Sequence, residues 1–269
     1  MDLKELAGHD LGTRRIRYGR RDAILYALSV GAAPDQLDLV YERDLRVLPA
    51  YGCALGLWAV EAAGSLGAYD RKRSLHAGQD LIVHAPLPPE GDFEMAGRIS
   101  SVWDKGRAAI VDVEAECESF TARYSIFLPG LGGWGGDRGP ASASVEIERP
   151  DWRGAFKTWE NQAAIYRLTG DLHPIHVDPA VSAAMGFDRP ILHGLCTLGI
   201  AARMAAEAAG AHPCDLYELT ARLAAPVLPG DQIVVTAQAE GADVRFETLT
   251  EATAAIKGGV ARYYKRDTR

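Results

Sequence analysis

The chain contains an internal repeat, and a duplicated sequence limits the possible folds more than any single motif does. Residues 23–36 align with residues 163–176 at an offset of 140, which places Tyr26 on Tyr166. The same offset relates "APLPPEGD" in the first half to "APVLPGD" in the second half. Two copies of one structural unit therefore account for most of the chain.

Each copy shows the same order of predicted elements: a short helix, a loop, one long Ala-rich helix and then a run of strands. The long helix covers "YGCALGLWAVEAAG" in the first copy and residues 195–209 in the second. Residues 195–209 carry apolar side chains at helical spacing and few charges, so this helix should be largely buried. Branched and aromatic residues dominate the strand segments, and Lys105-Gly106 suits a hairpin turn with a positive φ angle.

A buried helix wrapped by an antiparallel sheet is the hotdog layout. Its presence twice predicts an α+β protein with a double hotdog fold. We place the N-terminal half at residues 1–130 and the C-terminal half at residues 151–269. The segment between them, residues 131–150, contains "LGGWGGDRGP" and is expected to be a flexible linker.

Composition and charge exclude several classes of function. The formal charge of −7 argues against nucleic-acid binding, so the basic clusters "RRIRYGRR" and "DRKR" are expected to be solvated faces. No apolar run reaches the roughly 20 residues that span a bilayer, and the N-terminal segment lacks the pattern of a signal peptide. We therefore expect a cytoplasmic protein that binds no membrane. The four cysteines show no CxxC spacing, which predicts reduced and mostly buried thiols.

The second copy carries a loop, "YRLTGDLHPIHVDP", in which six residues include Asp171, His173 and His176. Three interpretations are open. An ordinary turn could leave the histidines in water, since Gly-Asp and His-Pro steps favour turns. His173, His176 and Asp178 could bind a metal, but their spacing is not the helical i, i+4 spacing that aims two imidazoles at one ion. An Asp/His pair could also perform general acid–base chemistry.

The repeat favours the third interpretation. At the three equivalent positions the first copy has no titratable side chain, but Gly31, Ala33 and Gln36. Polar groups that only stabilised the loop would be useful in both copies, whereas a catalytic pair is needed once. The chemistry is therefore expected in the second half.

These segments also carry a resemblance to a known family. The loop and the following "GFDRPILHGLCTLG" resemble the signature of the (R)-specific enoyl-CoA hydratases, also called hydratase 2 or MaoC-like dehydratases. In the first half, "YERDLRVLPAYG", "SLHAGQDL" and "VWDKGRAAIVDVE" are similar to the hydratase 2 part of peroxisomal multifunctional enzyme type 2. The resemblance covers roughly residues 15 to 265.

The resemblance implies an enzyme that reversibly adds water to a trans-2-enoyl-CoA and forms a (3R)-3-hydroxyacyl-CoA. The catalytic pair of the family maps onto Asp171 and His176, which would share one water, and the oxyanion donor maps onto the backbone N–H of Gly194. A helix N-terminus at Gly194 would suit a developing negative charge. No metal and no cofactor is required beyond the coenzyme A of the substrate, and a homodimer is expected.

Substrate contacts are implied by the same resemblance. Contacts to CoA and to the acyl chain map onto His76, Ala77, Lys105, Arg222 and Leu223. Two positions depart from the family pattern. His173 stands where relatives usually carry an Asn that helps to position the loop or the water, and Ala77 stands where similar proteins have glycine.

Other functions stay open on the sequence alone. A hotdog enzyme could instead hydrolyse a thioester, or dehydrate a branched, dicarboxylic or steroid-side-chain CoA ester. Only the spacing of Asp171 and His176 argues against a thioesterase. A non-catalytic acyl-CoA-binding protein would not need both members of the pair. The first half, which lacks catalytic residues, could form a tunnel for long or bulky acyl groups.

Overall fold

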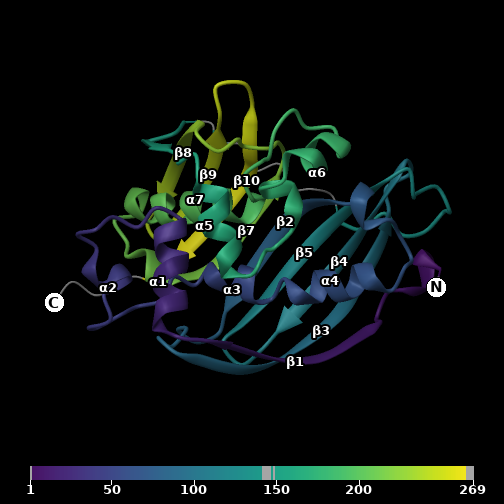
Figure 1. The fold of residues 1–269 in the computed structure, drawn as a ribbon, viewed down its shortest axis with the longest axis horizontal. Helices are drawn as coiled ribbons and strands as arrows, with labels where there is room; N and C mark the ends of the chain where they lie inside the picture. Colours follow the sequence, from purple (N-terminus) through teal and green to yellow (C-terminus); the bar gives the residue numbers. More distant parts are fainter. Residues whose placement is uncertain (1, 141–146, 148, 265–269) are drawn as a thin grey trace.

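The computed structural model describes residues 2–140, 147 and 149–264, in which ten strands form one antiparallel sheet (Figure 1). The first copy provides β1 (Asp10–Tyr18), β2 (Leu75–Val83), β3 (Gly91–Asp104), β4 (Ala108–Glu116) and β5 (Phe120–Pro129). The second copy provides β6 (Trp152–Lys157), β7 (Leu216–Leu223), β8 (Gln232–Glu240), β9 (Asp243–Leu249) and β10 (Ala254–Tyr263). Residues 141–146 and 148, which belong to the predicted linker, lie outside the described residues.

The order of the strands preserves the repeat. It runs β1-β3-β4-β5-β2-β7-β10-β9-β8-β6, so related strands occupy equivalent positions on either side of the central β2·β7 pair. Within that pair Asp80 faces Thr220, and these two residues are 140 positions apart in the sequence. The offset of the repeat therefore coincides with the symmetry of the strand pairing. This arrangement confirms the predicted double hotdog fold.

Alternation of apolar and polar residues explains how the strands form. In β3 the side chains of Phe93, Met95 and Ile99 are buried, while Asp92 and Glu94 are exposed. Successive side chains of a strand point to opposite faces, so this pattern requires one buried and one solvated face. The predicted turn is also confirmed, because the β3–β4 connection contains a glycine, residue 106, with a φ of +86°.

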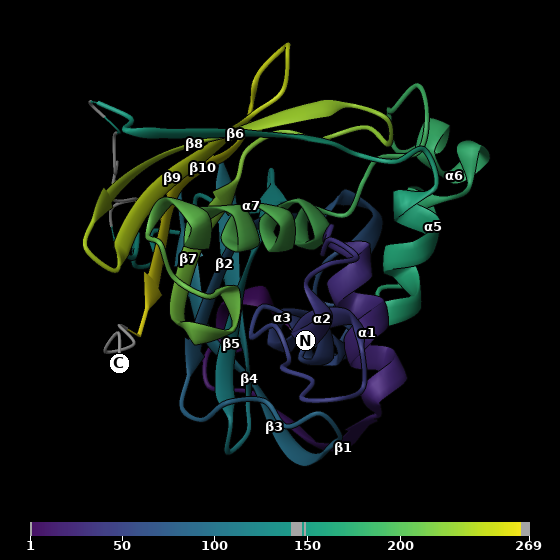
Figure 2. The ribbon, with the colours of Figure 1, turned by 90° about the vertical axis from the view of Figure 1, so that its left-hand side faces the viewer.

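Helices fill the inner side of the curved sheet (Figure 2). The first copy forms α1 (Arg20–Ser29), α2 (Leu37–Val40), α3 (Tyr51–Leu55) and α4 (Trp58–Ser65), and the second forms α5 (Gln162–Tyr166), α6 (Pro179–Ala184) and α7 (Gly194–Ala208). Short 3₁₀ helices occur as η1 (Leu3–Glu5), η2 (Arg71–Arg73), η3 (Arg167–Thr169), η4 (Pro174–His176) and η5 (Pro213–Asp215). As predicted, α7 is buried along most of its length, because its alanines let it approach β8 and β9 closely.

The prediction of one continuous helix over residues 51–64 is wrong, since α3 and α4 occupy this segment as two short helices. The Tyr124 hydroxyl donates a hydrogen bond to the carbonyl of Cys53 (2.7 Å). In a continuous α-helix that carbonyl would accept the amide of Leu57. The Leu57 amide instead donates to the carbonyl of Ala54 (3.3 Å), so one turn is tightened and the helix is interrupted.

The sequence pattern did not predict the strands β1, β2, β6 and β7. Much of the basic cluster "RRIRYGRR" lies in β1, where its arginines are exposed, as expected for a solvated face. Arg15 donates two hydrogen bonds to the Asp92 carboxylate in β3 (2.6 and 2.7 Å), and Arg17 donates a third (3.2 Å). These ion pairs therefore link the side chains of the edge strand β1 to its neighbour β3.

The described part of the predicted linker, residues 131–140, is held to the end of β3 by hydrogen bonds, contrary to the expectation of a flexible segment. The carboxylate of Asp104, at the end of β3, accepts hydrogen bonds from the amides of Gly106, Gly133 and Gly135 (2.8 Å each) and of Gly136 (3.3 Å). These amides, that of Gly133 foremost, lower the pKa of Asp104 to about 2. Positive φ angles at Gly133 and Gly135 allow their N–H groups to converge on one carboxylate.

Two expectations from composition can be compared with the described residues. Cys53, Cys117 and Cys196 are buried thiols, as predicted, and Cys214 is partly buried. Within the described part of the chain, no helix combines the length and the apolar character needed to cross a membrane.

Candidate active site

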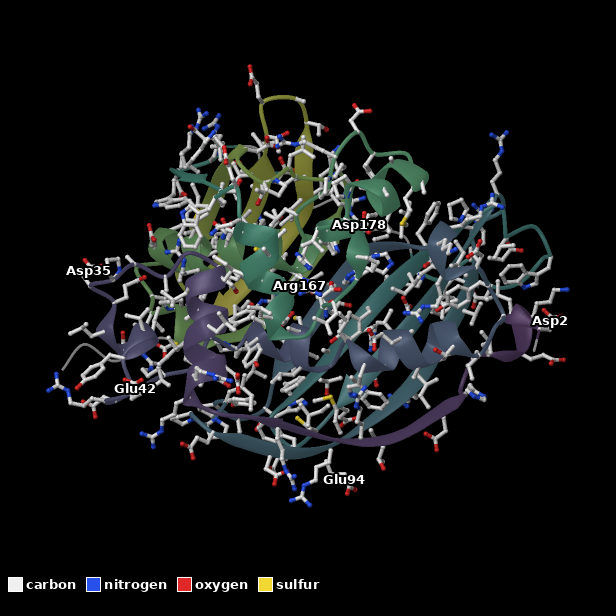
Figure 3. The ribbon with its side chains drawn as sticks, viewed as in Figure 1. Asp2, Asp35, Glu42, Glu94, Arg167 and Asp178 are labelled. Atoms are coloured by element: carbon white, nitrogen blue, oxygen red, sulfur yellow. The ribbon has the colours of Figure 1, made fainter. Side chains whose placement is uncertain are left out.

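The loop "YRLTGDLHPIHVDP" leads from α5 to α6 near the centre of the molecule, where Figure 3 labels Arg167 and Asp178. Gly170 adopts a φ of +136°, which residues with a Cβ rarely adopt, and turns the chain after η3. Pro174 begins η4, and the Asp178 carboxylate then caps α6 by accepting one of its first amides (2.8 Å). The loop is therefore fixed at both ends.

This geometry brings Asp171 and His176 together, as the sequence predicted. The Nε2 atom of His176 lies 3.9 Å from the Oδ2 atom of Asp171. Both side chains are mostly buried, with exposed fractions of 11% for His176 and 17% for Asp171. The separation is too long for a direct hydrogen bond and suits a water molecule that contacts both groups.

The tautomer of His176 follows from its other ring nitrogen. Nδ1 lies 2.8 Å from the carbonyl oxygen of Ile191, which can only accept a hydrogen bond. Nδ1 therefore carries the hydrogen of the neutral ring, and Nε2 presents its lone pair on the side of Asp171. Burial lowers the pKa of His176, and the neighbouring carboxylate of Asp171 only partly opposes this shift. At neutral pH the ring can accept a proton at Nε2.

The ring of His173 caps the loop. Its Nδ1 accepts a hydrogen bond from the amide of Ile175 (3.3 Å), while the amide of His173 donates to the Asp171 carboxylate (3.2 Å). An Asn side chain would supply an equivalent acceptor at the start of a short helix. His173 therefore makes the kind of loop contact expected of the Asn that it replaces in the family pattern.

A second buried histidine, His193, belongs to the site, although no sequence motif indicated it. Its ring stacks on that of His176 with a centroid separation of 3.6 Å and an interplanar angle of 24°. Its Nε2 lies 3.2 Å from the carbonyl oxygen of Asp171. Burial lowers the pKa of His193 to about 3. The available signal was its position directly before Gly194, at the start of a helix that faces the loop.

Asp171, His176 and His193 also form a group of possible metal ligands, whose ligand atoms lie within 4.8 Å of one another. The two imidazoles do not suit one ion, because stacked rings direct their lone pairs side by side instead of towards a common point. One nitrogen of each ring also contacts a backbone carbonyl. The set proposed from the sequence, His173, His176 and Asp178, fits a metal ion no better, because the Asp178 carboxylate caps α6.

Helix α7 begins at Gly194, and its N-terminus lies beside the loop that carries Asp171 and His176. The first amides of a helix have no acceptor within the helix, and they form the positive end of its dipole. A Cβ atom on Gly194 would lie 2.8 Å from Cδ1 of Leu223, so a larger residue would collide with this wall. Gly194 lines the same cavity as Asp171 and His176. The site thus combines a proton acceptor, a carboxylate and a helix end that stabilises negative charge.

These groups line a cavity of about 390 Å³ between the two copies. Its walls are mainly apolar. The first copy contributes Leu57, Val60, Leu75, His76 and Ile126, and the second contributes Ile191, Leu192, Leu223, Val227 and Ile256. A concave, largely apolar site with a few converging polar groups is typical of a small-molecule pocket.

Of the predicted substrate contacts, the structure brings His76 and Leu223 to the cavity. His76 is held by its Nε2, which lies 3.0 Å from the carbonyl oxygen of Gly78, and burial lowers its pKa to about 4. Ala77 is the bulged residue of β2, and Arg222 is exposed on β7. Neither lines the cavity, so their roles stay predictions.

Lys105 is also not brought to the cavity. Its ammonium group donates hydrogen bonds to the backbone carbonyls of Arg138 and Pro140 (3.3 Å to the latter). Lys105 therefore helps to fix the glycine-rich segment beside the β3–β4 turn. A contact between this lysine and a CoA phosphate stays a prediction.

Two charged side chains that no sequence motif indicated also line the cavity, Glu61 in α4 and Arg71 in η2. Arg71 belongs to the "DRKR" cluster, which was expected to be only a solvated face. The basic residues of this cluster are exposed, in agreement with that expectation, and the aliphatic part of Arg71 also packs against Gly64 and lines the cavity.

Two family models match the chain. The model described as "MaoC like domain" matches residues 142–259, and that described as "MFE-2 hydratase 2 N-terminal domain" matches residues 16–128. The boundary between them falls within the glycine-rich segment. The two matches therefore correspond to the two copies of the repeat.

Individual relatives match over most of their length. The chain is 35% identical to "Probable enoyl-CoA hydratase 2" of Dictyostelium discoideum, over 87% of this chain and 85% of the relative. It is 33% identical to "Enoyl-CoA hydratase ChsH3" of Mycobacterium tuberculosis, over 90% of each protein.

Solved structures share the fold. A MaoC-like dehydratase from Phytophthora capsici superposes with a TM-score of 0.88 at 26% identity, over 99% of both chains. The peroxisomal multifunctional enzyme type 2 of Drosophila melanogaster superposes with a TM-score of 0.79 at 28% identity, over 94% of this chain and 48% of that one. A Mycobacterium tuberculosis protein described as a double hotdog fold matches at 13% identity with a TM-score of 0.61, covering 98% of each chain, which supports the fold alone.

Proposed function

Because the chain belongs to the enoyl-CoA hydratase 2 family of MaoC-like proteins, we propose that it reversibly hydrates a trans-2-enoyl-CoA to a (3R)-3-hydroxyacyl-CoA. The observation that carries the proposal is the pairing of Asp171 with a neutral His176, 3.9 Å apart, on the wall of a mainly apolar cavity. One water between them would be held, oriented and deprotonated.

The proton transfers follow from the tautomer of His176. Its Nε2 accepts a proton from the water while the water oxygen forms a bond to the β-carbon of the substrate. The electrons of the carbon–carbon double bond move towards the thioester carbonyl. The imidazolium then returns the proton to the α-carbon, so one water supplies both the hydroxyl group and the hydrogen. The carboxylate of Asp171 orients the water and stabilises the imidazolium.

The negative charge that develops on the thioester oxygen is stabilised by the backbone N–H of Gly194. This amide is at the first position of a 15-residue helix, where the helix dipole favours an anion. Donors fixed in a folded backbone need no reorganisation when the charge appears. Addition of both groups from the side of the one water would be syn, in keeping with an R product.

The apolar walls of the cavity suit an acyl chain. Side chains of α4 extend the cavity into the first copy, which supports substrates longer than a four-carbon enoyl group. The proposal requires no cofactor besides the coenzyme A of the substrate. The homodimer and the cytoplasmic location stay predictions from the sequence, and size-exclusion chromatography and cell fractionation would test them.

The proposal is tested by incubating the protein with crotonyl-CoA and with octenoyl-CoA. Hydration should reduce the enoyl absorbance without releasing free thiol. The product should be oxidised by an (R)-specific 3-hydroxyacyl-CoA dehydrogenase and give no NADH with an (S)-specific one. Thiol release would instead support the alternative of a thioesterase, and NADH formation with the (S)-specific enzyme would refute the stereochemical assignment.

The catalytic pair has its own test. Asp171→Asn and His176→Ala should each lower kcat by about 10² to 10⁴-fold, because each removes a group that acts in proton transfer. Gln36→Ala is the matched control, since Gln36 occupies the position of His176 in the first copy, and it should leave kcat nearly unchanged. Either variant of the pair that keeps more than about a tenth of the wild-type kcat would exclude the assignment.

A further inference from the structure

His193 has no part in the proton transfers described above, yet it contacts both members of the catalytic pair. Its ring contacts two others, with centroid separations of 3.6 Å to His176 and 4.8 Å to Tyr166. The His193 residue is almost completely buried, with an exposed fraction of 1%. A buried imidazole in this position needs an explanation, because burial of a polar ring is unfavourable unless it is well bonded.

The protonation of His193 follows from its hydrogen bonds. Nε2 lies 3.2 Å from the backbone carbonyl oxygen of Asp171, and a carbonyl can only accept, so Nε2 carries the hydrogen. Nδ1 is buried and has no hydrogen-bond partner among the described residues. The two stacked histidines thus hold opposite tautomers, since His176 carries its hydrogen on Nδ1.

We propose that His193 is a positioning residue for the hydration reaction, which holds the main chain of Asp171 through Nε2 and the ring of His176 through the stack. The inference rests on the proposed function and assigns no proton transfer to His193. It explains why a histidine is suited to this position: only a flat ring with an N–H on its edge makes both contacts at once.

The stack also has a consequence during turnover. When His176 accepts a proton, its imidazolium faces the ring of a neutral aromatic group, and such a face attracts a cation. A second protonated histidine would repel it. Burial keeps His193 neutral, and the positive charge of His176 would oppose its protonation further.

Several charged or titratable groups surround His176 and would influence its protonation. Its own loop contributes Asp171 and His173, and the segment before α7 contributes His193. Glu160 and Arg189 line a second hollow that His176 borders. The charge of Arg167 helps to lower the pKa of His193. The charge of Asp171 partly opposes the lowering of the pKa of His76 on β2. A substitution at position 193 removes none of these other groups.

The first test is His193→Ala. Loss of both contacts should lower kcat roughly ten- to a hundredfold, with little change in KM, because small displacements of catalytic groups have effects of this size. Water would reach the exposed face of His176 and reduce the desolvation that lowers its pKa, so the acid limb of the kcat profile should move to higher pH. His84→Ala is the control, since His84 is an exposed residue bound to Thr121, and it should change neither quantity.

The second test is His193→Phe, which keeps a ring of similar size but has no N–H for Asp171. Its acid limb should stay near that of the wild type, while its kcat should fall. If His193→Ala fails to fold, this variant still tests whether the N–H of His193 positions Asp171. A purely structural role predicts no shift of the acid limb in His193→Ala, and that result would overturn the inference, as would a wild-type kcat in both variants.

NMR of the imidazole nitrogens gives a readout that does not depend on activity. In the wild-type protein, His193 should carry its hydrogen on Nε2 and should not titrate near neutral pH, and His176 should carry its hydrogen on Nδ1. A hydrogen on Nδ1 of His193 would overturn the inference. Absence of hydration by the wild-type protein would instead refute the proposed function, whereas full activity of His193→Ala would refute only the role of His193.

Discussion

In the proposed mechanism, Nε2 of His176 must be unprotonated to accept a proton from water, and this requirement predicts a pH dependence. Burial lowers the pKa of His176 below its ordinary value of 6.5, so the neutral ring persists to lower pH than in an exposed histidine. As the pH falls through this lowered pKa, Nε2 becomes protonated and hydration is lost. We expect the acid limb of the kcat profile, measured with crotonyl-CoA, to lie below pH 6.5. A limb above that value would contradict the assigned base.

A second prediction at the residue scale concerns His173. His173→Asn should keep kcat within about tenfold of the wild type, a barrier change of about 1.4 kcal/mol. The amide oxygen of Asn can accept the hydrogen bond from Ile175 that Nδ1 of His173 accepts now. His173→Leu, which has no acceptor, should be more impaired. If steady-state kinetics find His173→Asn as inactive as His176→Ala, His173 is a direct proton carrier.

Individual residues could be predicted where the repeat supplied a comparison. Asp171 and His176 were identified because the first copy has neutral residues at their positions. His193 could not be found in this way, since only the folded chain brings it against a loop 17 positions earlier. Lys105 was predicted correctly in a turn, but the backbone carbonyls that bind its ammonium group lie in a segment 33 and 35 residues away.

At the scale of elements, strands with clear alternation and a marked turn were predicted, namely β3 to β5 and β8 to β10. Of the others, the two edge strands were missed for a physical reason. β1 and β6 lie at the edges of the sheet, and exposed polar residues occupy many of their positions. The break between α3 and α4 depends on Tyr124, which lies far along the sequence, so no local pattern could reveal it.

The break between α3 and α4 gives a prediction for stability. A Cβ atom on Gly56 would lie 2.5 Å from the Tyr124 hydroxyl oxygen and 3.0 Å from Cβ of Ala115. Gly56→Ala should therefore lower the free energy of unfolding, by about 1–3 kcal/mol for overpacking of this kind. In a Tyr124→Phe background the closest obstacle is absent, so the same change should be less destabilising.

Urea unfolding of the wild type, the two single variants and the double variant measures this coupling. The effects of Gly56→Ala and Tyr124→Phe should not add. Additive losses of unfolding free energy would mean that the hydroxyl group does not restrict this position.

At the scale of the whole molecule, the cavity is shared: the second copy supplies Asp171 and His176, and α4 of the first copy supplies part of the wall. Val60→Phe should therefore narrow the part of the cavity that α4 lines. We expect kcat/KM for octenoyl-CoA to fall roughly tenfold or more, which corresponds to about 1.4 kcal/mol, with a much smaller effect on crotonyl-CoA. Ile82→Phe is the control, because Ile82 is 50% exposed on β2. An equal loss for both substrates would contradict an acyl site beside α4.

The overall architecture could be predicted because duplication leaves a trace that does not depend on any single element. The offset of 140 residues reappears in the pairing of Asp80 with Thr220, so one number connects the sequence to the centre of the sheet. The shape of the cavity could not be predicted to the same extent, since it depends on side chains from both copies that meet only after folding.

The continuous sheet formed by two unequal copies also has an evolutionary consequence. In a homodimer of a single-copy ancestor, one gene would encode both subunits that line each cavity. A substitution that widened the part of the cavity lined by one subunit would therefore also change the part lined by the other. Fusion of two genes removes this constraint. The position equivalent to Asp171 could become Gly31 while the aspartate itself was retained. Selection could then act on substrate shape in one copy and on chemistry in the other.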